Sequence, residues 1–184
     1  VLTNVAPAVA EAAIKSGVAR TSLDDLKNYA RDLSGRLHVS ATFMKSIRDN
    51  LSTKVQNFGK KVRMVFAAGS NSRVLYTVQS LREENLIEPI LIGNKSRIHK
   101  KIDSLNLDNL KDIQIVEPES HELFKKFTGE FYKNRQRKGI SKAYSQELMS
   151  QANYFGSMLV NEGLADALIS GPTQTFPECF IPVM

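Results

Sequence analysis

The stretch "VRMVFAAGSNSRVLYTVQSLREENLIEPILIGN", residues 62–94, decides the fold class of this chain. A short apolar run stands at each end of it, and a glycine closes each run. Between the runs, apolar residues recur at positions 74, 75, 78 and 81, the spacing of one helix face. The pattern predicts a strand over 62–67, a helix over 72–85 and a strand over 88–93. Such a unit joins two neighbouring parallel strands.

The same alternation continues to the end of the chain. Further strands are predicted over 112–118 and 165–171, and helices over 94–105, 120–139, 141–151 and 153–164. Ser141 has N-cap chemistry, and Gly139 follows a cationic last turn and suits a left-handed C-cap. Short apolar strands alternating with helices predict an α/β fold of three layers, α/β/α, around a mainly parallel sheet.

The first part of the chain has helix composition instead. Helices are predicted over 7–16, 21–33 and 38–55, with Pro7 at a first helical position and Gly17 as a stop. The pattern changes from helical periodicity to a short apolar run near residue 58. We therefore expect N-terminal helices to precede the α/β part.

Composition narrows the class of protein. Lys and Arg number 25 and Asp and Glu 19, and the net charge of +6 favours anionic ligands or partners. The single cysteine, Cys179, excludes an internal disulfide and suits a reducing compartment, so we expect a cytoplasmic protein. No apolar run reaches the roughly 18 residues of a membrane span, so no membrane contact is expected. The three histidines have no metal-ligand spacing, so no metal site is expected.

Three basic segments raise nucleic-acid binding as one alternative function. They read "GKKVR" (59–63), "NKSRIHKK" (94–101) and "KNRQRKG" (133–139). Interleaved aromatic residues are missing from them, and they fall on separate predicted elements. Solvated helix faces account for them more simply, so no nucleic-acid partner is expected.

Two strand ends carry small polar residues, and open parallel sheets bind ligands at the carboxyl ends of their strands. The first strand is followed by Gly69, Ser70, Asn71 and, at the start of the helix, Arg73. Backbone amides at a helix start with a nearby Arg can bind an anion, but on the motif alone a strand-to-helix turn with Ser and Asn as caps is the favoured interpretation. The stretch matches neither a Walker loop nor the dinucleotide fingerprint.

The fourth strand runs into the turn "SGPTQT", residues 170–175. Glycine lets a ligand approach the backbone, and hydroxyl groups donate to phosphate or carbonyl oxygen. Ser170, Gly171, Thr173 and Thr175 are therefore candidates for polar contacts with a ligand.

Taken together, the segments resemble a known family. Residues 62–94 are similar to the first strand–helix–strand unit of the phosphotransacetylases, the phosphate acetyl/butaryl transferase family. The later pieces "KG" (138–139), "NYFG" (153–156) and "ADALISG" (165–171) match recurring family pieces in order and spacing. The resemblance covers about residues 58–184 and implies the phosphotransacetylase fold.

The N-terminal stretch "VAPAVAEAAIKSGVART", residues 5–21, resembles the closing helix of the catalytic region of bacterial hybrid malic enzymes. In these an appended phosphotransacetylase-like domain follows. The resemblance implies that residues 1–35 end the malic enzyme region and linker, and that 36–184 begin the appended domain, incomplete at its C-terminus. The parent would convert malate to pyruvate with NADP and Mg²⁺ or Mn²⁺, all bound outside this sequence.

One departure from the family bears on function. Phosphotransacetylases usually read "EGEDER" where this chain reads "AGSNSR", residues 68–73, so acidic groups that could act as charge partners or bases are lost. The family's catalytic Ser, Arg and Asp would lie beyond Met184, which implies no catalytic residue in this chain. The resemblance to hybrid malic enzymes implies that the appended domain senses acetyl-CoA and promotes homo-oligomerisation, and the lost acidic groups favour this regulatory role over group transfer. An active phosphate acetyltransferase is the alternative.

The same resemblance places the turn after the fourth strand at the cleft for acyl-CoA or acetyl phosphate. It implies polar contacts from Ser170, Gly171, Thr173 and Thr175. A phosphate contact is expected from Arg73, supported by Gly69, Ser70 and Asn71.

Overall fold

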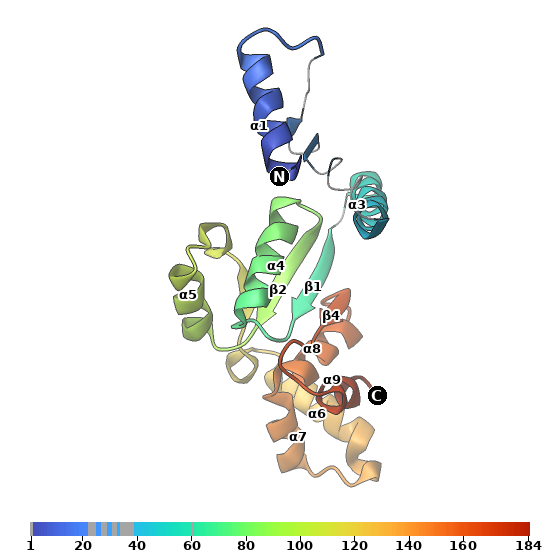
Figure 1. Ribbon diagram of the computed structural model, residues 1–184. Coiled ribbons are helices and arrows are strands. Elements are labelled where there is room, and N and C mark those ends of the chain that lie inside the picture. The colour runs from blue at the N-terminus through green and yellow to red at the C-terminus, as the bar shows by residue number, and fades with distance from the viewer. Residues whose placement is uncertain (1, 22–24, 27–28, 31–32, 34–38, 60) are drawn as a thin grey trace. The chain divides into compact units, whose positions relative to one another are not determined.

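The computed structural model describes residues 2–21, 25–26, 29–30, 33, 39–59 and 61–184 (Figure 1). The chain divides into two compact units, residues 1–59 and 60–184, which coincides with the pattern change near residue 58. The first unit contains α1 (Leu2–Lys15) and α3 (Val39–Phe58). Most of the helix predicted over 21–33 lies outside the described residues, and the boundary predicted after residue 35 stays a prediction.

The position predicted for Pro7 is wrong. Helix α1 begins at Leu2, so Pro7 lies inside it and not at its first position. Proline lacks a backbone N–H and therefore removes one hydrogen bond of the helix at this point. The predicted stop is confirmed, because Gly17 follows the helix with a positive φ of 74°.

The second unit alternates strands and helices as predicted. Its strands are β1 (Val62–Phe66), β2 (Ile87–Ile92), β3 (Gln114–Val116) and β4 (Ala167–Ile169). Its α-helices are α4 (Ser72–Glu83), α5 (Lys95–Ser104), α6 (Phe124–Arg135), α7 (Lys142–Met149), α8 (Ala152–Asn161) and α9 (Phe176–Phe180). Short 3-10 turns lie at 108–110, 118–120, 136–138 and 181–183. The predicted caps are confirmed: Ser141 accepts from the Tyr144 amide, and Gly139 is left-handed.

The four strands form one parallel sheet in the order β3-β2-β1-β4. The chain moves from β1 outward to β3 and then returns to the other side of β1. Right-handed crossovers therefore place α4 and α5 on one face and the connection through α6, α7 and α8 on the other. In Figure 1 these last three helices form a group of their own. The predicted three-layer α/β/α fold is confirmed.

Helix α8 packs closely against its face of the sheet at Gly156. A Cβ added there would lie 2.8 Å from Leu168 Cδ1, 3.2 Å from Ile92 Cδ1 and 3.4 Å from Val65 Cγ1, atoms of three adjacent strands. The core on this face includes the fully buried rings of Phe127 and Phe155, whose centroids are 5.2 Å apart. The close approach of the α8 backbone at Gly156 thus sets the packing distance between the sheet and this helical layer.

An ion pair joins β1 to the turn before β4. The Arg63 guanidinium donates to both carboxylate oxygens of Asp166, at 2.9 and 3.2 Å, and to the Gly163 carbonyl at 2.8 Å. The backbone N–H of Arg63 donates to Asp166, and the Asp166 N–H donates to the Arg63 carbonyl. The side-chain hydrogen bond to Asp166 raises the pKa of Arg63 above its ordinary value. These bonds hold residues about a hundred positions apart in register.

The crevice of such a sheet lies where the strand order reverses, outside the carboxyl ends of the strands. Here that point is between β1 and β4, which pair directly from Met64–Ala167 to Phe66–Ile169. The two loops singled out from the sequence follow these two strands. Because β1 and β4 are adjacent and parallel, the two loops begin side by side at the carboxyl ends of the strands.

Of the helices that the structure describes, none combines the length and apolar character that a bilayer crossing demands.

We expect Gly156→Val to lower the free energy of unfolding by about 1–3 kcal/mol, because the new side chain overpacks the contact with the sheet. Urea unfolding of the 184-residue chain, followed by circular dichroism, measures this. Gly129→Val in α6 is the matched control, since an added Cβ there meets no atom within 4 Å. A change within about 0.5 kcal/mol is expected for the control. Equal losses in both variants would contradict the close-packing argument.

Candidate functional site

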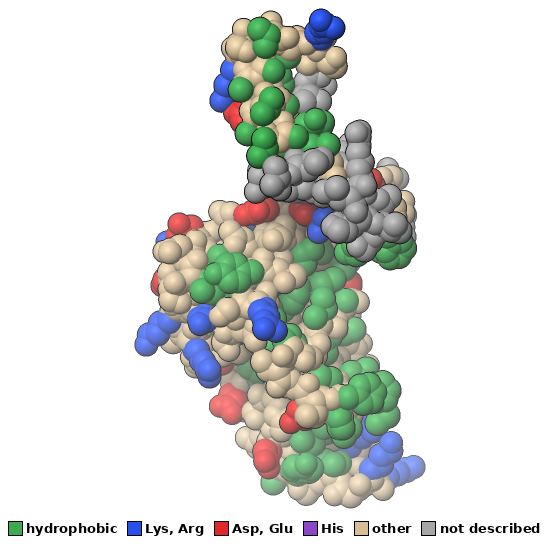
Figure 2. Space-filling view, in the orientation of Figure 1, with side chains coloured by type: hydrophobic (Ala, Val, Ile, Leu, Met, Phe, Trp, Pro, Cys, Tyr) green, Lys and Arg blue, Asp and Glu red, His purple; other side chains and the backbone are tan. Residues whose placement is uncertain are grey.

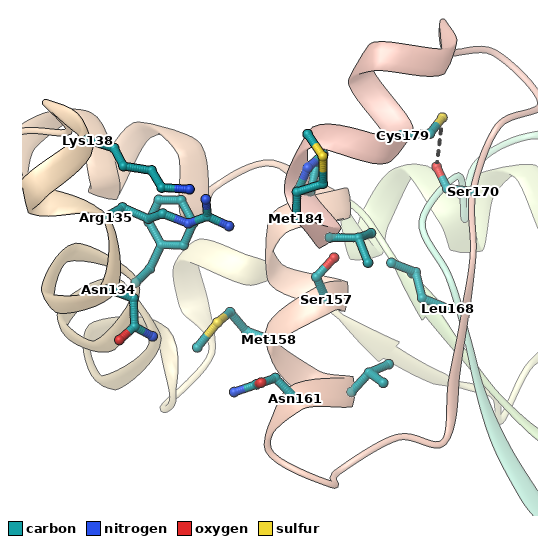
Figure 3. A pocket seen from close by; sticks show the side chains of 14 residues that line it. Asn134, Arg135, Lys138, Ser157, Met158, Asn161, Leu168, Ser170, Cys179 and Met184 are labelled. Atoms are coloured by element: carbon teal, nitrogen blue, oxygen red, sulfur yellow. Dashed lines mark hydrogen bonds between the residues drawn. The ribbon is translucent and has the colours of Figure 1, made fainter.

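A cavity of about 740 Å³ lies beside the end of β4 (Figure 3). Helices α6 and α8, the end of β4 and the C-terminal turns form its walls. Its lining residues are Phe131, Asn134, Arg135, Lys138, Ser157, Met158, Val160, Asn161, Leu168, Ser170, Cys179, Pro182, Val183 and Met184. The volume lies within the range of about 300–1,000 Å³ that is usual for small-molecule sites.

The cavity has a cationic side and an apolar side. Arg135 and Lys138 come from the end of α6 and the turn after it, and their side chains extend toward Met184 in Figure 3. Neither cation forms an ion pair with another described residue. Met158 and Leu168 are part of the apolar wall. The arrangement suits a ligand that carries both anionic and apolar groups.

Ser170 lies on the β4 side of the cavity within a hydrogen-bonded cluster. Its hydroxyl is 2.7 Å from Asn153 Oδ1 and 2.9 Å from Gln174 Oε1, and its single proton donates to one of them at a time. It also lies 3.5 Å from Cys179 Sγ, the pair joined by a dashed line in Figure 3. A hydrogen bond from Ser170 to a ligand would therefore replace an internal one.

The buried side-chain amide of Asn153, at the start of α8, holds this cluster together through its hydrogen bonds. Its Nδ2 donates to Gln174 Oε1 at 2.9 Å and to the Glu178 carbonyl at 2.8 Å. Only 3% of the residue is exposed, so water cannot readily replace these partners. One side chain thus ties α8 to the turn after β4 and to α9.

The other residues of the turn have different surroundings. Thr175 is the N-cap residue of α9, and its N–H and hydroxyl both donate to Glu178 Oε2, at 2.7 and 3.0 Å. Its hydroxyl is therefore already engaged. Thr173 is exposed, and Gly171 has a φ of 120° with open space where a side chain would be. Neither Thr173, Thr175 nor Gly171 is among the residues that line the cavity.

The loop after β1 is largely occupied by its own backbone contacts. Asn71 Oδ1 accepts from the N–H groups of Arg73 and Val74, which is the capping alternative raised from the sequence. The Gly69 N–H donates to the Ile92 carbonyl at 3.2 Å, and a Cβ on Gly69 would lie 2.7 Å from that oxygen. Glycine is therefore needed here because the end of β2 comes so close.

The structure brings together only part of the predicted site. Ser170 lines the large cavity, whereas Ser70 lines a separate hollow and Arg73 is exposed in the first turn of α4. Ligand contacts from these residues stay predictions. Sequence reasoning missed Arg135 and Asn153 as parts of the site, although both lie in or beside pieces that carried the family resemblance, "KG" and "NYFG". From the sequence, the cations before Gly139 were explained by the helix dipole and as a solvated helix face.

Comparison with known proteins identifies the family. The sequence pattern described as phosphate acetyl/butaryl transferase matches residues 43–183. This chain belongs to that family. A solved structure, EutD phosphotransacetylase from Staphylococcus aureus, superimposes with a TM-score of 0.67 at 30% sequence identity. That match covers 76% of this chain and 42% of the other.

Two kinds of relative match this chain, malic enzymes and phosphate acetyltransferases. An NADP-dependent malic enzyme of Salmonella typhimurium is 34% identical over 182 residues, which is 97% of this chain and 23% of the relative. A phosphate acetyltransferase of Staphylococcus aureus is 31% identical over 144 residues, 78% of this chain and 42% of that protein. The chain thus spans about a quarter of the malic enzyme it matches and less than half of the transferase.

We expect Asn153→Ala to destabilise the protein by about 1–3 kcal/mol, because the Glu178 carbonyl and Gln174 amide lose a buried partner. Urea unfolding measures the change. Asn134→Ala, on the exposed rim of the same cavity, is the matched control and should change stability by less than about 0.5 kcal/mol. A result for Asn153→Ala no larger than the control would show that the amide does not organise the turn.

The cap of α9 should respond to acid. Hydrogen bonds from the Thr175 backbone N–H and then from its hydroxyl lower the pKa of Glu178 from its ordinary value of 4.5. A lowered carboxyl pKa stabilises the folded cap above the ordinary value, and this stabilisation is lost as pH falls through the lowered pKa. The Thr175 amide chemical shift should therefore titrate with a midpoint below 4.5.

Glu178→Gln should abolish this titration of the Thr175 amide while leaving the fold intact at neutral pH. A midpoint at or above 4.5 in the unmodified chain would contradict the lowered pKa.

Proposed function

We propose that the cavity beside β4 binds an acyl-CoA or acyl phosphate. The observation that carries this proposal is the pair of unneutralised cations, Arg135 and Lys138, opposite an apolar wall. A phosphate group matches the guanidinium and ammonium groups, and an apolar acyl or pantetheine segment matches a wall that includes Met158 and Leu168. Ser170 would supply a polar contact between the two sides by exchanging one internal hydrogen bond. The family name, phosphate acetyl/butaryl transferase, supports the same ligand class.

The parent protein is proposed to be an NADP-dependent malic enzyme that oxidatively decarboxylates malate to pyruvate. The support is the extent of the matches: malic enzymes align over 97% of the chain, including residues before the family match begins at 43. The phosphate acetyltransferase of Staphylococcus aureus aligns over 78%. Residues 1–35 would then end the malic enzyme region, and residues 36–184 would begin the appended domain.

NADP and Mg²⁺ or Mn²⁺ would bind in the parent's catalytic region. Among the described residues of this chain, His, Cys, Asp and Glu side chains form no group of three suited to hold a metal ion. No step of the proposed function is therefore assigned to such a group here.

Within this parent, regulation is the role we propose, through acetyl-CoA binding and homo-oligomerisation. Residues 68–73 support sensing without group transfer, because no acidic side chain stands there to act as a base. Asn71 in this stretch caps α4. The alternative is an active phosphate acetyltransferase, which the identity of 31% to the Staphylococcus aureus enzyme supports.

Direct binding of acetyl-CoA to the 184-residue chain tests the cavity. Arg135→Gln/Lys138→Gln should weaken binding at least about tenfold in titration calorimetry, because charge-assisted hydrogen bonds are lost. Lys133→Gln/Arg137→Gln removes the same charge from exposed neighbours that do not line the cavity, and should weaken it less than about twofold. Equal losses in both variants, or no binding to the unmodified chain, would refute the assignment.

Two assays on the full-length parent separate the roles. Acetyl-CoA should change malate-dependent NADP reduction by the intact enzyme but not by a folded, active form cut before residue 35. Arg135→Gln/Lys138→Gln should remove the response and keep basal activity. Robust formation of acetyl phosphate from acetyl-CoA and phosphate would favour the transferase alternative.

A further inference from the structure

A second hollow, of about 300 Å³, lies on the α4–α5 face of the sheet. Its lining residues are Ser70, Arg97, Lys100, Lys101 and Ser104. Four of them belong to α5, and Ser70 belongs to the loop after β1. The hollow shares no lining residue with the cavity beside β4, whose helical walls lie on the opposite face. It is a separate site, and the inference drawn from it does not rest on the proposed function.

The sequence of α5 places its cations in this hollow. Ile98 and Ile102, four residues apart, are fully buried and fix the rotation of the helix against the sheet. Arg97, Lys101 and Ser104 follow one another at spacings of four and three residues, so they share another face of the helix. Lys100 lies three residues after Arg97 and lines the same hollow. The basic segment "NKSRIHKK" is thus not a uniformly solvated surface.

Ion pairs within the described part of the chain do not neutralise the charges of the hollow. Arg97, Lys100 and Lys101 form no ion pair with any described residue. A side-chain hydrogen bond with Asp108 raises the pKa of Lys111, and the charge of Asp103, the acidic residue of α5, adds a smaller contribution in the same direction. Three cations of one short helix therefore line one hollow with no ion-pair partner among the described residues, and bringing like charges close together is unfavourable unless an anion binds.

A neighbouring surface site shows the contrast. A hollow of about 390 Å³ on the same half of the sheet is lined by Arg82, Glu83, Asp108, Asn109 and Asp112. There the Arg82 guanidinium donates to Asp112 at 2.7 Å and to the Asn109 carbonyl at 2.6 Å. The arginine of that site is paired internally, whereas the residues that line the α5 hollow are three cations and two serines, with no acidic side chain among them.

One further cation extends the positive field of the hollow. Arg73 is exposed in the first turn of α4, three residues after Ser70. Lys and Arg side chains gather over α5 and the start of α4 in Figure 2. The Ser70 hydroxyl makes no hydrogen bond to another described residue and so has its proton available for a ligand oxygen. Ser104, in contrast, donates to the Lys101 carbonyl.

We propose that this hollow binds the diphosphate group of a small phosphorylated metabolite. The three cations match the two to three negative charges of a diphosphate better than the single charge of a carboxylate, and the arginine fork suits phosphate oxygens. The volume lies at the lower limit of small-molecule sites, about 300 Å³, so it takes the phosphate groups and leaves the rest of the ligand outside. Ser70 donates to a phosphate oxygen from the sheet side.

Titration of the 184-residue chain with inorganic pyrophosphate at low ionic strength tests the site, with ¹⁵N amide shifts as the local readout. Saturable shifts are expected at Ser70 and along α5. Arg97→Gln/Lys100→Gln should weaken binding at least about tenfold, and Ser70→Ala should weaken it measurably. Both cations are exposed, so the double variant should remain folded, which its circular dichroism spectrum checks.

The charge-matched control is Lys125→Gln/Lys142→Gln, which removes two exposed cations on α6 and α7, away from the hollow. It should change pyrophosphate affinity less than about twofold. Equal weakening in both double variants would overturn the proposal, because only the net charge would then matter. No saturation at millimolar pyrophosphate would overturn it as well. So would tight binding of a single-stranded oligonucleotide that pyrophosphate does not displace.

The same variants also distinguish this site from the cavity beside β4. Arg135→Gln/Lys138→Gln should leave pyrophosphate binding at α5 unchanged, and Arg97→Gln/Lys100→Gln should leave acetyl-CoA binding beside β4 unchanged. Loss of pyrophosphate binding in the Arg135→Gln/Lys138→Gln variant would overturn the second site without touching the first proposal.

Discussion

The pairing of β1 with β4 is the constraint on which the rest of this domain depends. It joins residues about a hundred positions apart, and the Arg63–Asp166 ion pair holds its register. Because β4 returns to the far side of β1, the strand order reverses between them and a crevice forms at their carboxyl ends. Loss of this pairing would separate the two strand-end loops and remove the wall of the cavity that Ser170 provides.

The cavity is pre-organised by hydrogen bonds that the protein makes with itself. Asn153 is buried and satisfied, and through it α8 supports Ser170, Gln174 and the start of α9. Polar groups at such a strand end are therefore not all free for a ligand. Arg135 and Lys138 beside β4, and the cations of α5 on the other face, form no ion pair with another described residue. Cations without an ion-pair partner among the described residues are the feature that both hollows share, and anion binding is the chemistry that we propose for each.

Features that depend on residues close together in the chain were predicted from the sequence, whereas contacts between distant segments were largely missed. The individual strands and helices and the caps at Ser141 and Gly139 were predicted, because each depends on residues within one turn or one element. The three-layer class followed from the order in which these elements alternate along the chain. The prediction that Pro7 is the first residue of its helix was wrong, because a helix start depends on a few residues whose preferences for that position are weak. Of the candidate residues, Ser170 was found in the large cavity, while Arg135 was overlooked there.

By itself, then, the sequence determined the elements, their parallel class and, through the order of its motifs, membership of a transferase family. Tertiary structure alone decided which strand ends are neighbours, which cations share a hollow and which hydroxyls are already engaged. The physical reason is that periodicity and capping act over a few residues, whereas strand order and side-chain facing depend on packing between distant segments. Arg97 and Ser70 are far apart in the chain, and the close approach of the β1 loop to the end of β2 at Gly69 brings them together.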